Sequence, residues 1–357
     1  MSDEARGTGL DRASDPLPRR RRSRRSPYHR PRRRDAEGSD IPGPTYAALD
    51  LGTNNCRLLV ARATREGFRV IDAFSRIIRL GEGVSGSGRL SETAIARAVE
   101  ALRVCRAKMK NRGVTRARMV ATEACRAAEN CDQFLDRVRE EVGIELEVVD
   151  RETEALLAAT GCTPLIDPEA SGVILFDIGG GSSELVRLDR PAPAQYGPPH
   201  PAIRAWASLP LGVVTLAERH GGINVSPALF EAMTAEVAEH VQRFVAAHGD
   251  STDGLHLLGT SGTVTTIAGV HLELPRYERR QVDGCWMGQA EVTRVIERLL
   301  AMSYEERVAN PCIGVERADL VLAGCAILEA IRRAFPCTRL RVADRGLREG
   351  MLVQMMR

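Results

Sequence analysis

The stretch Val173–Val186, which contains three consecutive glycines, constrains the fold of this 357-residue chain more than any other. Four apolar residues lead into Asp177, and after the glycines two serines and Glu184 open a second apolar run. Apolar runs bounded by glycines predict a strand, a tight turn and a second strand. A plain β-hairpin is one interpretation, since two-glycine turns are common, but three glycines exceed what a hairpin needs.

The composition of this turn favours phosphate binding. A backbone without Cβ atoms can approach a ligand closely, successive exposed N–H groups form an anion-binding concavity, and the serine hydroxyls add donors. Asp177 and Glu184, at the two ends of the turn, offer the hard oxygen ligands that hold Mg²⁺ beside a phosphate. The predicted phosphate ligands in this turn are Gly179, Gly180, Gly181, Ser182 and Ser183.

A second turn of the same kind lies 127 residues earlier, in Tyr46–Val60. Asp50-Leu-Gly aligns with Asp177-Ile-Gly, and the apolar run that begins at Arg57 aligns with the run that begins at Glu184, without a gap. A turn that is built twice predicts two related lobes that face one another. The candidate phosphate ligands of this first turn are Gly52, Thr53, Asn54 and Asn55.

A third glycine and hydroxyl turn follows an apolar strand within residues 256–266. It could be a turn without a ligand, but a third such turn fits better as part of a phosphate-binding wall. Its candidate ligands are Thr260, Ser261 and Gly262.

Two acidic residues open a predicted helix that follows Asp150. Glu152 and Glu154 are two positions apart, which places them about 200° apart around a helix, so they cannot both face one site. One could act as a base while the other is solvated, or both could simply favour the helix dipole. Arg126, at a helix start after a short predicted strand, could reach an oxyanion or be an ordinary surface arginine.

The net charge of +3 conceals an uneven distribution. Residues 1–40 hold twelve arginines and seven acids, a balance of +5, whereas the remainder carries −2. Residues 1–43 are rich in Arg, Pro and Ser and too poor in apolar residues to fold, so we predict a disordered arm that could attract polyanions. A solvated tail without function, or a start site assigned too far upstream, would explain the same composition.

The cysteines and the hydropathy of the chain indicate the cellular compartment in which it is expected. The nine cysteines are scattered and form no Cys-x-x-Cys pair, which disfavours a metal ribbon or redox motif and favours reduced thiols in the cytoplasm. No window is long and apolar enough for a membrane span, and no apolar stretch follows the twin arginines to suggest an export signal.

Six ordered motifs between Tyr46 and the C-terminus resemble the exopolyphosphatase and guanosine pentaphosphate phosphohydrolase (Ppx/GppA) family. They are residues 50–55, 121–126, 152–155, 177–184, 259–263 and 344–350. The resemblance implies an α/β, two-lobed actin-like ATPase fold of the sugar kinase, Hsp70 and actin type, with duplicated ribonuclease H-like domains and an interdomain cleft. The expected domains are 44–160 and 161–357, with the last helix packing back on the first lobe; the chain resembles the short form without the C-terminal helical domain.

The resemblance also assigns roles. Glu154 falls at the family's catalytic glutamate, Arg126 at a phosphate-contacting arginine, and Asp177 and Glu184 at acids associated with the divalent cation. One departure is Thr53-Asn54-Asn55, where members usually read Ser-Asn-Ser; it could alter substrate preference.

The implied activity is hydrolysis of the terminal phosphoanhydride of polyphosphate, of the 5′-γ-phosphate of pppGpp, or both. The pppGpp activity would give the protein a role in the stringent response. We expect Mg²⁺ or another divalent cation, a homodimer, and no membrane. An actin-like ATPase or kinase, or a non-catalytic sensor of guanosine polyphosphates, remains the alternative.

Overall fold

The computed structural model describes residues 43–64, 67–190, 200–249 and 251–357. Residues 43–357 form one compact unit. The predicted arginine-rich arm lies outside the described residues, apart from Gly43, as does most of the Pro-rich loop within residues 189–202.

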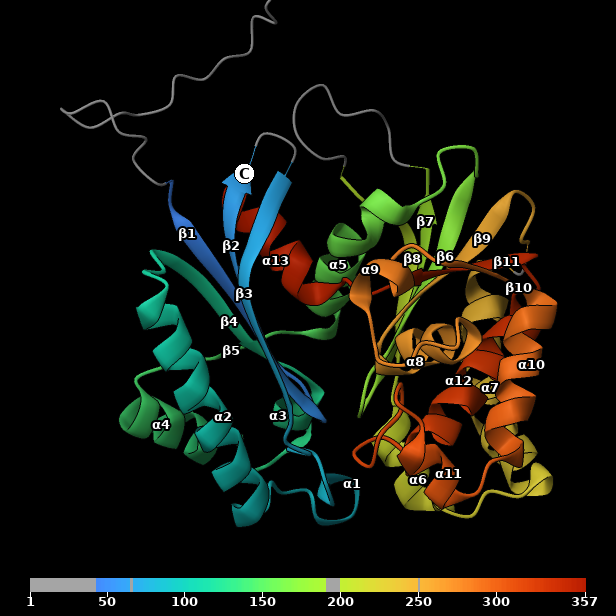
Figure 1. The fold of residues 1–357 in the computed structure, drawn as a ribbon, viewed down its shortest axis with the longest axis horizontal. Coiled ribbons are helices and arrows are strands. Elements are labelled where there is room, and N and C mark those ends of the chain that lie inside the picture. Colours follow the sequence, from blue (N-terminus) through green and yellow to red (C-terminus); the bar gives the residue numbers. More distant parts are fainter. Residues whose placement is uncertain (1–42, 65–66, 191–199, 250) are drawn as a thin grey trace, which may run out of the picture. The chain divides into compact units, whose positions relative to one another are not determined.

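The first sheet has five strands in the order β3-β2-β1-β4-β5 (Figure 1). Strands β1, β2 and β3 are antiparallel, and β4 and β5 run parallel to β1. The strands are β1 (Thr45–Leu51), β2 (Asn55–Thr64), β3 (Gly67–Ile77), β4 (Arg116–Ala121) and β5 (Glu147–Val148).

The second sheet has six strands in the order β10-β11-β9-β6-β7-β8. Without β10, its order and strand directions repeat those of the first sheet, with β6, β7 and β8 in the places of β1, β2 and β3. The strands are β6 (Gly172–Ile178), β7 (Ser183–Asp189), β8 (Ala202–Leu209), β9 (Leu255–Thr260), β10 (Trp286–Gly288) and β11 (Arg339–Ala343). The duplication that the two turns predicted therefore extends to the whole sheet.

The central strands β1 and β6 are buried on both faces of their sheets. Successive side chains of a strand point to opposite sides, so neighbouring residues belong to different cores. Leu49 of β1 faces the core beneath α2 (Glu92–Asn111) and α4 (Cys131–Val142), while Ala48 faces α13 (Leu347–Met356). Phe176 and Leu175 divide in the same way between two cores of the second sheet. Ser91 caps α2 by accepting a hydrogen bond from Ala94 N.

The remaining helices surround the second sheet or connect strands. They are α1 (Val84–Ser87), α3 (Glu123–Ala127), α6 (Val213–His220), α7 (Pro227–His248), α8 (Gly262–His271), α9 (Arg279–Val282), α10 (Gln289–Ala301), α11 (Tyr304–Ala309), α12 (Val321–Ala334) and the 3₁₀ turn Thr163–Leu165. No described helix is long and apolar enough to cross a membrane.

Helices α5 (Arg151–Cys162) and α13 lie between the sheets and pack closely on each other (Figure 1). A Cβ at Gly161 would meet Gly346 O at 2.0 Å, and one at Gly350 would meet Leu157 O at 2.0 Å. Helix α13 begins at Leu347 and contains Gly350. Gly350 serves close helix packing rather than a turn. Leu157 packs toward the first sheet and Ala155 toward the second, so α5 is shared by both.

Candidate active site

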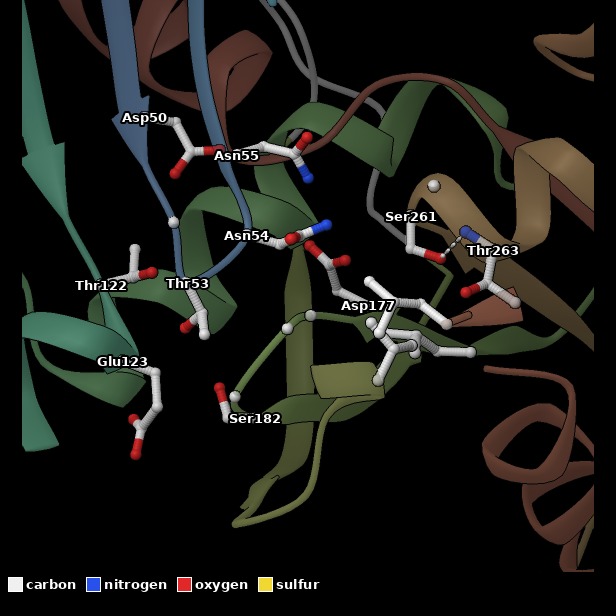
Figure 2. A pocket seen from close by; sticks show the side chains of 18 of the residues that line it. Asp50, Thr53, Asn54, Asn55, Thr122, Glu123, Asp177, Ser182, Ser261 and Thr263 are labelled. Atoms are coloured by element: carbon white, nitrogen blue, oxygen red, sulfur yellow. Dashed lines mark hydrogen bonds between the residues drawn. The ribbon is translucent and has the colours of Figure 1, made fainter. Parts of the chain in front are cut away.

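The two glycine turns meet at the cleft between the sheets. Thr53 of the first turn packs against the second turn, where a Cβ on Gly180 would lie 2.9 Å from Thr53 Cβ and one on Gly181 2.9 Å from Thr53 Oγ1. Figure 2 shows Thr53, Asn54 and Asp177, from opposite sides of the cleft, around one pocket. The contact is possible because the second turn carries no side chains at these positions.

Most of the predicted site residues line this pocket. They are Gly52, Thr53, Asn54, Asn55, Glu154, Asp177, Gly179, Gly180, Gly181, Ser182, Glu184, Ser261 and Gly262. Three predicted residues do not line it. Ser183 Oγ donates to Leu211 O, Thr260 Oγ1 donates to Arg345 O, and Arg126 lies behind the pocket wall. Thr260 instead borders a second pocket that continues the cleft.

The same register holds in both hairpins, but the charges differ. Asp50 is paired across the strands with Arg57, and Asp177 with Glu184. Residues directly opposite each other in antiparallel strands share a face, and all four side chains reach the cleft. The first hairpin therefore presents a carboxylate beside a guanidinium group, and the second presents two carboxylates.

Buried acids accumulate at this point. Burial raises the pKa of Asp177 to about 7, aided by the charge of Glu154. Burial and the charge of Asp177 raise the pKa of Glu184 to about 7, although Ser182 and Ser208 both donate hydrogen bonds to Glu184 Oε1. Burial also raises the pKa of Asp50. Several carboxyl groups buried this close together are stable only if some are protonated or if a cation lies beside them.

Glu154 projects into the pocket from α5, whereas Glu152 is exposed. Burial, and then the charge of Glu184, raise the pKa of Glu154 to about 8, against the opposing effect of Arg126. Its Oε2 atom is buried and forms an ion pair with Arg126. The geometry distinguishes the two glutamates, which sequence spacing alone could not do.

Arg126 is fully engaged by protein atoms. Its Nη1 donates to Val149 O at 2.7 Å, and its Nε and Nη2 donate to Glu123 Oε2 at 3.0 and 2.7 Å. The same Nη2 lies 2.8 Å from Glu154 Oε2. Arg126 thus contacts the two carboxylates rather than the pocket itself.

Three arginines that sequence reasoning did not place in the site converge on the cleft: Arg57, Arg317 and Arg348. Among the described residues, no ion pair joins any of them to a carboxylate, although Asp50 lies near enough to influence Arg348. Burial, and then repulsion by Arg57, lower the pKa of Arg317. Arg57 stood in the aligned motif; Arg317 and Arg348 carry no local signal, because the fold brings them from distant segments.

Two asparagine side chains in the pocket have oxygen atoms without protein partners. The side-chain Oδ1 atoms of Asn54 and Asn55 are buried without a hydrogen bond among the described residues. Ser261 has a φ of 146°, which is uncommon for a residue with a side chain, and caps α8 by accepting from Thr263 N and Val264 N. Unpaired buried polar atoms and a constrained cap are typical of a ligand site.

The donor set suits a divalent cation of the magnesium type. Asp177 and Glu184 offer two carboxylates from one hairpin, and Mg²⁺ in proteins is held by one or two carboxylates together with water and substrate phosphates. No cluster of three or more His, Cys, Asp or Glu side chains in the described part of the chain forms a complete metal site. The residues therefore fit an ion that is completed by its ligand.

The duplicated sheets, with two facing glycine turns between them, define a two-lobed protein of the actin-like fold. Among solved structures, the Aquifex aeolicus Ppx/GppA family member is similar, with a TM-score of 0.72 at 28% identity over 88% of this chain and 97% of that one. An exopolyphosphatase-like protein gives a TM-score of 0.78 at 27% identity over 88% and 98%.

The sequence profile of the Ppx/GppA phosphatase family matches residues 59–357, and the chain belongs to this family. It is 30% identical to exopolyphosphatase 2 of Mycobacterium tuberculosis over 303 residues, which cover 80% of this chain and 89% of the relative. It is 27% identical to guanosine-5′-triphosphate,3′-diphosphate pyrophosphatase of Aeromonas hydrophila, of which it spans 60%. The predictions of the family, the fold class and a hydrolase are confirmed.

Proposed function

We propose that this protein hydrolyses the terminal phosphoanhydride of inorganic polyphosphate, the 5′-γ-phosphate of pppGpp, or both. The observation that carries the proposal is the position of Glu154. Its buried carboxylate, paired with Arg126 through Oε2, lies in the pocket that both glycine turns and the acids Asp177 and Glu184 line. The names of the two curated relatives support these substrates.

In the proposed mechanism, backbone N–H groups of the two turns hold the terminal phosphate and orient it. Phosphoryl transfer depends mainly on positioning and charge stabilisation, which preorganised donors supply. Asp177 and Glu184 would hold Mg²⁺ or another divalent cation, which supplies neutralisation of the phosphate charge. Glu154 accepts the proton of the attacking water as general base.

The arginines favour a substrate with several phosphates. Arg57 and Arg317 line both pockets and Arg348 lines the second, and the two pockets also share Asp50, Asn55 and Asp177. Guanidinium groups without carboxylate partners in a partly desolvated cleft bind phosphate oxygens strongly. The terminal phosphate would occupy the turns, and the following phosphates would extend toward the arginines.

The test is phosphate release from long-chain polyphosphate, pppGpp and ATP, measured side by side with Mg²⁺ and with EDTA. Release from polyphosphate or pppGpp that needs the cation supports the proposal. Tight binding and turnover of ATP alone would indicate an ATPase or kinase. Binding of guanosine polyphosphates without phosphate release would indicate a sensor.

We also propose that residues 1–43 bind polyanions, that the protein is a cytoplasmic homodimer, and that its pppGpp activity serves the stringent response. Removal of residues 1–43 should raise the KM for long polyphosphate and flatten its dependence on salt, because fewer counterions are released on binding. Unchanged KM values at low and high salt would exclude this role for the arm.

A further inference from the structure

Glu123 lines the pocket, although no motif assigned it a role. It is the first residue of the short helix α3, separated from β4 by Thr122, and its side chain is 13% exposed. It lies against the second turn, where a Cβ on Gly181 would come within 3.2 Å of Glu123 Cγ. A buried carboxylate at this place needs a reason, because desolvation of the charge is costly.

The carboxylate of Glu123 is held by two arginines. Its Oε2 accepts from Nε and Nη2 of Arg126, and its Oε1 accepts from Nη2 of Arg151 at 2.8 Å. Because both oxygens are engaged, the side chain has a defined orientation. Charge-assisted hydrogen bonds of this kind are stronger than neutral ones and fix geometry as well.

One nitrogen atom joins Glu123 to the proposed base. Nη2 of Arg126 lies 2.7 Å from Glu123 Oε2 and 2.8 Å from Glu154 Oε2, while Nη1 is held by Val149 O. Without Glu123, the guanidinium would keep only Val149 O and Glu154 as partners. It could then turn fully toward Glu154 and contact both carboxylate oxygens instead of Oε2 alone, which would move the carboxylate and leave neither oxygen free to take a proton.

We propose that Glu123 is a positioning residue for the hydrolysis reaction: it holds Arg126 so that Glu154 is oriented by this arginine but stays free to accept a proton. The inference rests on the proposed function of Glu154 as base. Glu123 contacts neither the water nor the phosphate in this account, and its effect passes through Arg126. Small displacements of a catalytic group can cost up to about 100-fold in rate, so the contribution is measurable.

The test compares Glu123→Gln with wild type in steady-state phosphate release from long-chain polyphosphate and from pppGpp with Mg²⁺. We expect kcat to fall by about 10- to 100-fold while KM changes less than about 3-fold, because a positioning residue affects the reacting geometry rather than binding. Glu123→Asp retains the charge and should recover part of the lost kcat.

A double-mutant comparison separates this role from a merely structural one. In an Arg126→Met background, Glu123→Gln should cause no further loss of kcat, since its effect requires the arginine. Arg151→Gln, which leaves the contact between Glu123 and Arg126 in place, should have a much smaller effect. Glu152→Gln, at an exposed position of the same helix as Glu154, is the control that should match wild type.

Each outcome bears on the inference. Full activity of Glu123→Gln, an effect confined to KM, or an equal further loss in the Arg126→Met background would overturn it. Thermal unfolding of each variant identifies loss of fold, and in that case Glu123→Asp carries the comparison: activity no better than that of Arg126→Met would overturn the inference. Absence of phosphate release by wild type would instead overturn the proposed function, and the inference with it.

Discussion

The two hairpins of the cleft share one backbone design and differ in charge. In each hairpin, an aspartate lies near the end of the first strand and a glycine turn follows. A residue near the start of the second strand is paired with that aspartate, and its side chain also faces the cleft. That opposite residue is Arg57 in the first hairpin and Glu184 in the second. One substitution at an equivalent position thus gives one hairpin a charge suited to phosphate and the other a charge suited to a cation.

The turns also differ in how their polar groups are satisfied. In the second turn, Gly179 O and Gly180 O accept from the first residues of α6, and both serines donate to protein acceptors. In the first turn, backbone oxygens of Thr53 and Asn54 hold residues 78–81, but the Asn54 and Asn55 Oδ1 atoms are buried without partners among the described residues. The second turn is therefore preorganised by the protein, whereas the first leaves groups for a ligand.

The largest expected effect comes from a residue outside both hairpins. Glu154→Gln keeps the shape of the side chain and removes its basicity, so turnover should fall by about 10²–10⁴-fold with little change in substrate binding. Phosphate release and equilibrium binding of polyphosphate measure the two quantities. If this variant kept wild-type turnover, positioning by the hairpins alone would account for catalysis.

Substitution of the two equivalent residues tests the charge comparison directly. Arg57→Gln should raise KM by roughly 10-fold and reduce the dependence of KM on salt, because a charge-assisted hydrogen bond contributes about 1.5–3 kcal/mol. Glu184→Gln should instead raise the Mg²⁺ concentration needed for half-maximal activity. Steady-state rates over a grid of substrate and Mg²⁺ concentrations distinguish them. The same response in both variants would mean that the two hairpins do not divide the roles.

The sequence allowed prediction of features that depend on local pattern. The gapless alignment of the two turns gave the strand–turn–strand structure in both places, and its register is confirmed at Asp50 and Asp177. The caps that Ser91 gives to α2 and Ser226 gives to α7 likewise depend on residues next to them in the sequence. Such features are set by neighbouring residues, so one sequence suffices to infer them.

Features that depend on distant contacts were not predictable. Gly350 lies in a helix, where its missing Cβ allows Leu157 O to approach closely. Nothing in the sequence around Gly350 indicates this contact with α5. Arg317 and Arg348 reach the cleft from segments about 130 to 300 residues away from the turns they face. The engagement of Arg126 by Glu123 requires side-chain geometry that a motif does not contain.

The glycines should respond unequally to an added methyl group. A Cβ on Gly180 would lie 2.9 Å from Thr53 Cβ, whereas one on Gly52 would have its nearest neighbour, Asn55 O, at an ordinary 3.5 Å. Gly180→Ala should therefore lower kcat/KM by about 10-fold and the free energy of unfolding by about 1–3 kcal/mol, while Gly52→Ala changes the free energy of unfolding much less. Gly86→Ala, with open space around its Cβ, is the control. Equal effects of the first two variants would show that the turns do not depend on close contact.

The smallest expected effect concerns the stability of the metal-free protein. The pKa of Glu184 rises from 4.5 to about 7 on folding. The folded state therefore binds this proton more tightly, so the stabilisation is complete below pH 4.5 and is lost as the pH rises through about 7. In EDTA, Glu184→Gln should raise the free energy of unfolding at pH 8 by on the order of 1–3 kcal/mol and change it little at pH 4.5.

Arg57→Gln, at the equivalent place in the first hairpin, should not show this pattern, since it removes a positive charge that favours the ionised Asp50. Denaturant unfolding of both variants at the two pH values measures the difference, and a pH-independent effect of Glu184→Gln would refute the assignment of uncompensated negative charge to the second hairpin.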